Sequence, residues 1–228
     1  ANQVDLDDKT LFSTIGKGKI VSLFEDYFYY GGFPELTHIS LKRDYLNSIY
    51  DKIYLGDITM RYGVTNQKAL ELLMKKIAET VRYPISFSRI TNIVKSVGIG
   101  VGTSTVIQYL QYAEESQLIF SLENYASKLV QKTTTPNYYF LDNGLLTLFL
   151  INSEPALLEN LVAIALVKKF GRDGAVFFYE KTLEVDFYVP SASLAIQVCY
   201  SMKDPITRER EIDRKSTRLN SSHESTSR

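Results

Sequence analysis

The spacing of apolar residues along the first half of the chain is that of amphipathic helices. Apolar side chains recur mostly three to five positions apart from 41 to 60 and again from 66 to 81, which places them on one face of a helix. Before them, the stretch YFYYGGFPEL at 27–36 joins an aromatic-rich segment to a Gly-Gly turn and a proline, which predicts that a helix ends there. We therefore expect helical segments that pack on a shared core.

Two shorter helical segments follow, at 86–97 and 103–118, on either side of the sequence GIGVG. Ser86 and Thr103 stand where N-cap residues are expected, because a side-chain oxygen there can accept a hydrogen bond from a backbone N–H of the first turn. Two helices joined by a short glycine-containing turn are typical of a helix-turn-helix.

After residue 118 the pattern changes to that of strands. The stretches LIFSLENYA (118–126) and NYYFLD (137–142) are rich in strand-forming residues and flank the polar connection SKLVQKTTTP. They predict a β-hairpin that follows the two helices as a wing. Together with the helix pair, this hairpin predicts a winged helix.

The remaining pattern predicts a small α/β unit. A helix is expected at 154–170, followed by strands at 175–180, 183–189 and 194–200, and by a further helix that starts near Pro205. The predicted fold class is therefore mixed α/β, with a helical and winged-helix N-terminal part followed by a small α/β domain.

Composition changes this picture little. Hydrophobic residues make up 45% and charged residues 23% of the 228 residues, proportions that are ordinary for a globular protein. No apolar run approaches the roughly 18 residues that a membrane span requires. The single cysteine, Cys199, cannot form an intrachain disulfide. We expect no membrane association and a cytoplasmic location.

The end of the sequence has a different composition. Residues 213–228, DRKSTRLNSSHESTSR, contain no aromatic and one aliphatic residue, which suits a disordered basic tail. From Asp213 to His223 they also resemble the translation of a common sequencing adapter, which suggests that the genuine chain breaks off near Ile212. We expect the N-terminus to be truncated as well, because the first residue is Ala.

Three features that suggest ligand binding have simpler structural interpretations. The glycines of GIGVG could bring backbone amides close to a phosphate, but no lysine follows them before the helix begins, so we favour a turn. The helix at 103–118 contains no Lys or Arg and carries Glu114 and Glu115, which opposes direct reading of DNA. The tyrosine clusters lack interleaved cations and suit packing better than base stacking.

The strongest chemical pattern lies in LEVDFYVPSASLAIQVCY, at 183–200. Nucleases that use Mg²⁺ hold the ion on carboxylate oxygens, and a familiar arrangement places one acid on a helix, a second on a strand and Glu-x-Lys on the next strand. Glu159 can supply the helical acid and Asp186 the strand acid. The third position carries Gln197 in place of the glutamate and Cys199 in place of the lysine.

Glu184 stands two residues before Asp186 and, by strand alternation, on the same face. It could compensate in part for the missing carboxylate, so the metal ligands expected here are Asp186 and Glu184. Two interpretations stay open. One is an active Mg²⁺-dependent nuclease that uses Glu159, Glu184 and Asp186. The other, which we favour, is a fold that keeps these acids together with Gln197 but does not cut.

The order of these motifs resembles that of a large family of prokaryotic AAA-type ATPases that end in a domain of uncharacterised function. The resemblance covers about 20 to 212 and is carried by YFYYGGFPEL, DKIYLGDITMRYGV, ISFSRITNIVKSVGIGVGTSTVIQYLQYAEESQLI, NYYFLDNGLL, LLENLVAIAL, LEVDFYV and AIQVCY. It matches Glu159 and Asp186 to the acids of a nuclease-like motif, from which Gln197 and Cys199 depart.

The resemblance implies four segments. The end of an ATPase module would occupy 1–40, a helical and winged-helix region 41–145, a restriction-endonuclease-like α/β domain 146–212, and the adapter-derived tail 213–228. The phosphate-binding loop would lie upstream, so ATP and Mg²⁺ are cofactors expected of the full-length protein, and none is expected of this fragment.

The resemblance also implies a role for the fragment in regulation or partner binding. The partner would be a protein or a nucleic acid, and oligomerisation would run through the missing ATPase module. The full-length protein would be an ATPase, whereas nuclease activity of this part is not expected. The alternatives are the active nuclease and a DNA-binding module without chemistry.

Overall fold

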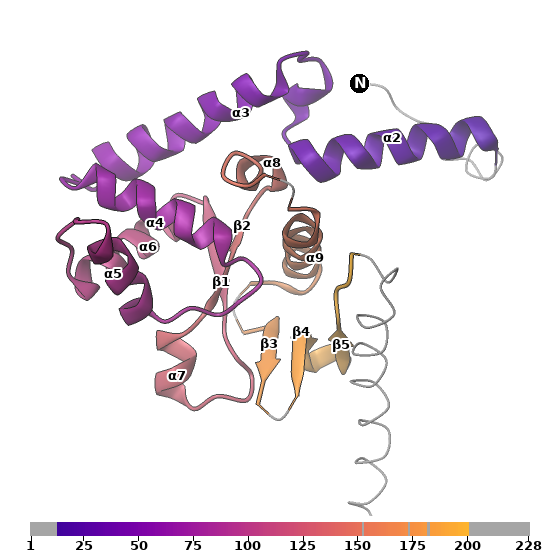
Figure 1. The fold of residues 1–228 in the computed structure, drawn as a ribbon. Coiled ribbons are helices and arrows are strands. Elements are labelled where there is room, and N and C mark those ends of the chain that lie inside the picture. Colours follow the sequence, from indigo (N-terminus) through magenta and orange to yellow (C-terminus); the bar gives the residue numbers. More distant parts are fainter. Residues whose placement is uncertain (1–12, 152, 173, 182, 201–228) are drawn as a thin grey trace, which may run out of the picture.

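The computed structural model describes residues 13–151, 153–172, 174–181 and 183–200, which form helices and two small antiparallel sheets (Figure 1). The mixed α/β class predicted from the sequence is confirmed. The helical elements are α2 (Thr14–Tyr30), η1 (Pro34–Thr37), α3 (Lys42–Asp51), η2 (Lys52–Met60), α4 (Gln67–Glu79), α5 (Phe87–Ser96), α6 (Thr103–Glu115), α7 (Leu129–Thr134), α8 (Asn143–Leu146), α9 (Glu154–Phe170) and η3 (Pro190–Ala192). The strands are β1 (Ile119–Leu122), β2 (Asn137–Phe140), β3 (Phe177–Glu180), β4 (Glu184–Val189) and β5 (Leu194–Ile196).

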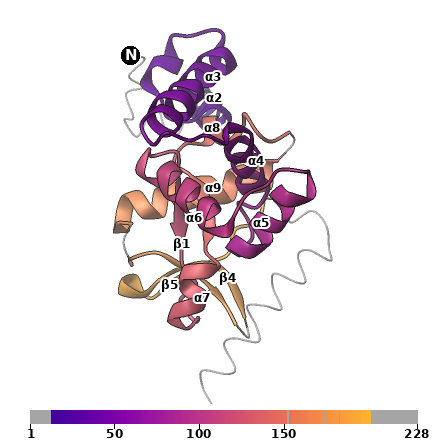
Figure 2. The ribbon, with the colours of Figure 1, turned by 90° about the vertical axis from the view of Figure 1, so that its left-hand side faces the viewer.

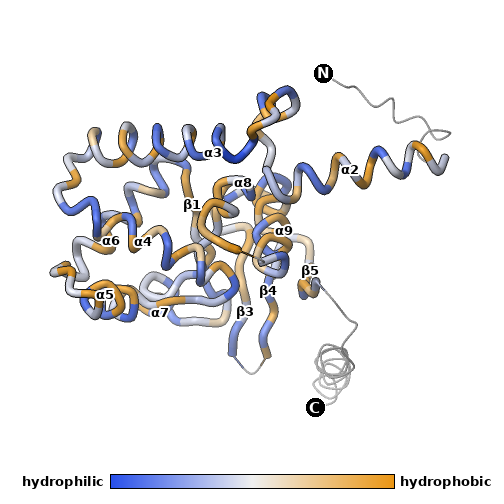
Figure 3. Tube along the Cα trace, turned by 45° about the horizontal axis from the view of Figure 1, so that its top comes forward, coloured by the Kyte–Doolittle hydropathy of each residue, from blue (hydrophilic) through white to orange (hydrophobic). Residues whose placement is uncertain are grey.

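Helix α2 extends away from the body of the molecule and meets it at its C-terminal end (Figure 1). Ser13 caps its N-terminus, since the Ser13 hydroxyl accepts a hydrogen bond from Gly16 N at 2.9 Å. The helix ends at Gly31, as the Gly-Gly turn predicts, and Gly31 adopts a φ of 81° that other residues take only with strain. Several apolar side chains of α2 are exposed, among them Ile15, Val21 and Phe24. The hydropathy colours of Figure 3 show that apolar residues recur along this helix.

The helix expected at 41–60 forms, but its hydrogen bonding changes halfway. The first half is α3, and the second half, η2, is a π-helix in which carbonyls accept from amides five residues ahead. Beyond it, Asn66 caps α4 by accepting from Ala69 N at 3.1 Å. One face of α4 is completely buried, which confirms the amphipathic pattern at 66–81.

Helices α5 and α6 form the predicted pair and pack against α4 and β1 (Figure 2). Ser86 is the N-cap of α5, with its hydroxyl accepting from Arg89 N at 3.3 Å, as expected. The expectation for Thr103 is wrong, because the chain enters α6 one residue earlier. Gly102 holds the extended N-cap conformation, so Thr103 already lies in the first helical turn.

Strands β1 and β2 pair in antiparallel register, with Ile119 opposite Phe140, which confirms the predicted hairpin. Its connection is not a plain polar loop, since it contains the short helix α7. The Lys132 ammonium on α7 lies 5.8 Å from the ring centre of Tyr125 and 5.5 Å from that of Phe177. These cation–π contacts hold α7 beside β3.

The C-terminal strands form one antiparallel sheet in the order β3-β4-β5. The turn η3 joins β4 to β5, so the strands expected at 183–189 and 194–200 pair as a hairpin. The second strand is shorter than expected, because it ends at Ile196. The sheet is fastened to the chain after β1 by Asn124, whose amide donates to Glu180 O at 2.8 Å and accepts from Glu180 N at 3.1 Å. The helix expected near Pro205 and the tail 213–228 lie outside the described residues.

Buried apolar side chains form one continuous cluster across both predicted parts. It includes Ile77 and Leu110 from the helical region, Phe140 from β2, and Ala163 and Phe187 from the C-terminal unit. The division at 145/146 therefore stays a prediction, while the two sides of it share a core. In the described residues, no helix combines the length and the apolar character needed to cross a bilayer.

Two buried asparagines tie the parts together. Asn160 on α9 accepts from Phe140 N at 2.7 Å and donates to Phe140 O at 3.0 Å, which attaches the helix to the end of β2. It also donates to the Asn143 side-chain oxygen at 2.9 Å. Asn143 in turn donates to Phe28 O at 2.9 Å and to Leu157 O at 3.0 Å, so one amide joins α2 to α9. Both side chains therefore have partners for the groups that burial would otherwise leave unpaired.

Asp142 and Gly144 hold the end of α2 in place. The Asp142 carboxylate accepts from Gly32 N at 2.8 Å and from Gly144 N at 2.8 Å. Gly144 approaches the backbone of Tyr30 so closely that a Cβ atom would overlap with the Tyr30 carbonyl. The motifs YYGGFP and LDNG thus meet in space, although more than a hundred residues separate them.

Candidate functional site

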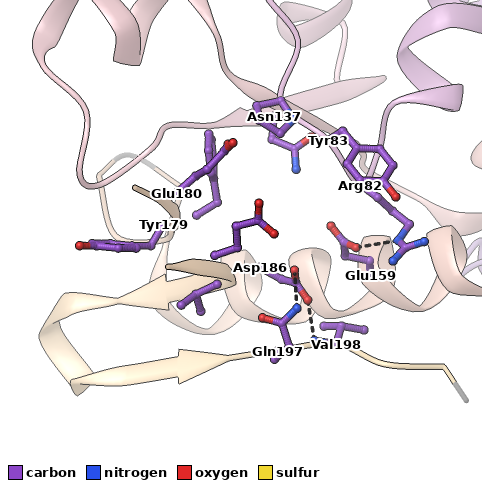
Figure 4. A pocket seen from close by; sticks show the side chains of 13 residues that line it. Arg82, Tyr83, Asn137, Glu159, Tyr179, Glu180, Asp186, Gln197 and Val198 are labelled. Atoms are coloured by element: carbon purple, nitrogen blue, oxygen red, sulfur yellow. Dashed lines mark hydrogen bonds and ion pairs between the residues drawn. The ribbon is translucent and has the colours of Figure 1, made fainter. Parts of the chain in front are cut away.

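A cleft of about 370 Å³ opens where α9, the β3-β4-β5 sheet and the segment after α4 meet (Figure 4). Glu159, Glu184, Asp186 and Gln197, the four residues singled out from the sequence, all line it. Their roles stay predictions, but the fold brings them together from α9, from β4 and from the segment that directly follows β5. The remaining lining residues are Arg82, Tyr83, Pro84, Asn137, Phe178, Tyr179, Glu180, Val185 and Val198.

Asp186 reaches the cleft from the middle of β4. The strand pairs antiparallel with β5 so that Phe187 lies opposite Ile196, and continuing this register places Gln197 opposite Asp186. The Gln197 amide nitrogen donates to Asp186 Oδ1 at 3.1 Å, and Val198 N donates to Asp186 Oδ2 at 2.6 Å (Figure 4). Both oxygens of this carboxylate therefore accept hydrogen bonds from the segment that directly follows β5.

Glu159 projects from α9 and is only 3% exposed. Its Oε2 accepts from Arg82 Nε at 3.2 Å, an ion pair between the helical region and the C-terminal unit. Its Oε1 accepts from the Tyr139 hydroxyl at 3.3 Å, and that hydroxyl accepts from the Asn137 amide at 2.7 Å. A chain of polar groups thus runs from β2 through α9 to the segment after α4.

The electrostatics of the site favour a protonated Glu159. Burial raises the pKa of its carboxyl to about 7, and the nearby negative charge of Asp186 raises it as well. The Arg82 guanidinium and the Tyr139 hydroxyl act in the opposite direction and do not cancel these effects. Glu159 can therefore exchange a proton near neutral pH, a property that is common among groups at functional sites.

The remaining acids lie at the rim. Glu184 is exposed and, as predicted, shares a face of β4 with Asp186, while Glu180 is exposed at the end of β3. Cys199, at the position of the motif's lysine, is half-buried and supplies no fixed positive charge. The charged groups around the cleft are four carboxyl side chains and one guanidinium.

The donor set does not fit a magnesium site. Mg²⁺ needs oxygen ligands that converge on one point in nearly octahedral geometry. Within the parts of the chain that the structure describes, no group of three or more His, Cys, Asp or Glu side chains is arranged to hold a metal ion. The two central carboxylates instead turn towards donors of the protein itself. The predicted ligand pair, Asp186 and Glu184, lines the cleft without completing such a group.

Sequence reasoning missed three residues that shape the site. Arg82 follows α4 in a turn, and Asn137 and Tyr139 lie on β2, far from α9 in the sequence. Their signals were weak, because an arginine in a turn and a strand-forming NYYF stretch are common. These residues come together only because α9 packs between the two segments, which brings Arg82 and Tyr139 to Glu159 and Asn137 to Tyr139.

Comparison with known proteins places the chain among uncharacterised relatives. Residues 21–156 match the family described as a domain of unknown function (DUF8612). An uncharacterized protein of Methanocaldococcus jannaschii is 29% identical over 212 residues, which cover 90% of this chain and 47% of that protein. An uncharacterized protein of Haemophilus influenzae is 32% identical over 127 residues, which cover 54% of this chain and 32% of that protein. No solved structure matches.

These relatives are longer than the matched regions. The chain spans about half of the archaeal protein and about a third of the bacterial one. Most of the described helical region lies inside the family match. Strand β4, which carries Asp186, and the segment after β5, which carries Gln197, lie beyond it.

Proposed function

The chain belongs to the family described as a domain of unknown function (DUF8612), and from this premise we propose that it is the C-terminal part of a AAA-type ATP-binding protein. In this proposal its winged-helix and restriction-endonuclease-like parts serve regulation or partner binding, and the nuclease-like site does not cut. The order of the sequence motifs supports the ATPase assignment, and the larger size of the relatives leaves room for the ATPase core.

The single observation that carries the loss of cutting is the internal pairing of the two central acids. Glu159 accepts from Arg82 and Tyr139, and Asp186 accepts from Gln197 and a backbone amide. A metal-dependent nuclease would leave such oxygens to the ion and would add a lysine for the charge that develops on phosphate. Here the guanidinium of Arg82 pairs with Glu159, and the lysine position holds cysteine.

The same pairing suits a structural coupling between the two parts of the chain. Arg82 belongs to the helical region and Glu159 to the C-terminal unit, so a partner that binds either part can influence the other through this ion pair. In the longer protein, nucleotide-driven motion of the ATPase module would reach the partner-binding parts by this route. ATP and Mg²⁺ would be cofactors of that module.

A second candidate, an active Mg²⁺-dependent nuclease, rests on a different observation. Glu159, Glu184 and Asp186 line one cleft, and the pKa of Glu159 near 7 would suit proton transfer at neutral pH. A DNA-binding module without chemistry has weaker support. The helix α6, which would enter the major groove, carries no Lys or Arg, so it offers no cation to the phosphates.

A nicking assay separates the first two candidates. Supercoiled plasmid is incubated with the chain in Mg²⁺ or Mn²⁺, and metal binding is measured by calorimetry, for the wild type and for Asp186→Asn. We expect no nicking and no metal binding that depends on Asp186. Nicking that the substitution abolishes would refute the proposal and favour the nuclease. The longer protein should hydrolyse ATP, whereas this chain alone should not.

A further inference from the structure

Helix α2 carries an apolar stripe that is buried only at its C-terminal end. Its side chains follow the i, i+3, i+4, i+7, i+8 spacing of one helix face, and they are Ile20, Leu23, Phe24, Tyr27 and Phe28. Phe28 is 5% exposed and belongs to the core, whereas Leu23 is 46% and Phe24 51% exposed. Single exposed apolar residues are ordinary, but a continuous row of large ones marks an interaction surface.

The attachment of α2 presents this stripe to solvent. The helix meets the body at its C-terminal end, and Figures 1 and 3 show the remaining turns running clear of it. The ring centres of Phe24 and Phe28 lie 5.9 Å apart, so the stripe continues outward from the core without a break. A surface that covers the outer turns therefore has to approach from outside the body.

The charges of α2 are divided between its two halves. Lys17 and Lys19 are exposed in the first half, and Glu25 and Asp26 are exposed in the second. Asp26 pairs with Lys42 at 2.7 Å and keeps a side chain that is 53% exposed. At 3.6 residues per turn, Lys17 and Glu25 flank one side of the stripe, and Lys19 and Asp26 flank the other. Each side therefore has a cation in the first half and a carboxylate in the second.

This distribution complements a second copy of the same helix in antiparallel orientation. When two copies cross near Ser22, Lys17 of one copy lies beside Glu25 of the other. Lys19 lies beside Asp26 of the other copy in the same way, and the two-fold symmetry repeats both pairs. Parallel pairing would instead place lysines beside lysines. Antiparallel pairing also sets the two bodies at opposite ends of the helix pair.

We propose that α2 pairs antiparallel with α2 of a second copy of the chain, stripe against stripe, in a dimer with two-fold symmetry. Leu23 and Phe24 lie near the centre of this interface. A pair of helices about 25 Å long buries less than the roughly 1,200 to 2,000 Å² of a stable interface, so the dimer should dissociate on dilution. The proposal goes beyond the proposed function and does not rest on it, because α2 contributes no residue to the cleft.

Sedimentation velocity of the full chain, from low to high micromolar concentration, measures this association. We expect monomer at the lowest concentration and a rising fraction of dimer above it. A chain that stays monomeric throughout would overturn the proposal and leave the stripe to the additional segments of the longer relatives. Species larger than a dimer would overturn it as well, because a two-fold pair leaves no copy of the interface free.

Substitutions on α2 locate the interface. Leu23→Glu introduces a good helix former at an exposed position, so it should fold normally, which circular dichroism checks. It should weaken dimerisation about a hundredfold, because each of the two copies loses an apolar contact worth roughly tenfold. Ile15→Glu makes the same change on the side of α2 away from the stripe, at a residue that is 78% exposed, and should leave dimerisation nearly unchanged. Equal losses in the two variants, or no loss in Leu23→Glu, would overturn the proposal.

Charge reversal tests the orientation. Lys17→Glu should weaken dimerisation by roughly threefold to tenfold, because exposed ion pairs are weak and the dimer contains two of each. Combining Lys17→Glu with Glu25→Lys exchanges the two charges and should restore the affinity of the wild type. No loss in the single variant, or no recovery in the double variant, would overturn the antiparallel arrangement.

The outcome is independent of the nicking assay. Nicking that depends on Asp186 would refute the proposed function and leave the dimer unaffected. A chain that neither nicks nor dimerises would overturn only the inference about α2.

Discussion

Replacing Glu159 with glutamine should change how the stability of the chain depends on pH. The pKa of the Glu159 carboxyl rises from 4.5 to about 7 on folding, mainly because of burial. One pKa unit corresponds to about 1.4 kcal/mol, so the ionised carboxylate is disfavoured in the folded state by roughly 3 kcal/mol. The side chain is 3% exposed, so solvent does little to reduce this value.

The sign follows from the direction of the shift. A carboxyl whose pKa is higher in the folded state stabilises the fold in its protonated form. That stabilisation is complete below about pH 4.5 and is lost as the pH rises to about 7. Relative to Glu159→Gln, which does not titrate, the wild type should therefore lose roughly 3 kcal/mol of unfolding free energy between pH 4.5 and pH 8.

Urea unfolding followed by circular dichroism measures this difference at four pH values between 4.5 and 8. Subtracting the two curves removes the titration of all other groups that both proteins share. Glu79→Gln serves as the matched control, because its exposed carboxylate pairs with Lys76 at the surface, and its curve should follow that of the wild type. Parallel curves for the wild type and Glu159→Gln would refute the argument that burial dominates this group.

Three further substitutions test the same framework by chemical denaturation. Arg82→Gln removes the group that lowers the pKa of Glu159, so it should destabilise the fold more at pH 8 than at pH 5; an equal loss at both values would contradict the ion pair. Gly144→Ala should cost about 1 to 3 kcal/mol because the added methyl group overlaps with a backbone carbonyl, whereas Gly18→Ala, in open space on α2, should be neutral or stabilising. Asn160→Ala leaves buried backbone groups of β2 without their partner and should cost about 2 to 4 kcal/mol; a loss below 1 kcal/mol would show that water replaces the amide.

Individual helices and their caps could be predicted because the sequence features that specify them lie within a few residues of one another. The helix at 154–170 forms with the expected bounds, and Ser86 caps α5, since apolar spacing and capping depend on neighbours within a turn. Helix α7 was not predicted because its six residues, LVQKTT, favour no single state, and its Lys132 contacts Tyr125 and Phe177 only in the folded chain. The π-helical half of 41–60 escaped for a similar reason, because apolar spacing does not distinguish the two helix types.

Three of the four acids that line the cleft, together with Gln197, were singled out from the sequence, whereas Glu180 and the partners of Glu159 were not. Strand alternation and the helix-strand-strand order suffice to bring Asp186, Glu184 and Glu159 together. The pairing of Arg82 with Glu159 joins residues 77 positions apart and depends on how two units pack, which no pattern in either segment encodes. The same holds for Asn137, whose unpaired oxygen exists only in the folded chain.

Helix α2 has the mechanical form of a lever. It has 17 residues and is therefore about 25 Å long, and it is held at its C-terminal end while the rest points away from the body. Its fixed end meets Asn143, which also holds the carbonyl of Leu157 on α9, two residues before Glu159. A force on the N-terminal end of α2 would rotate the helix about this attachment. Asn143 would pass the displacement to α9, close to the position where Glu159 lines the cleft.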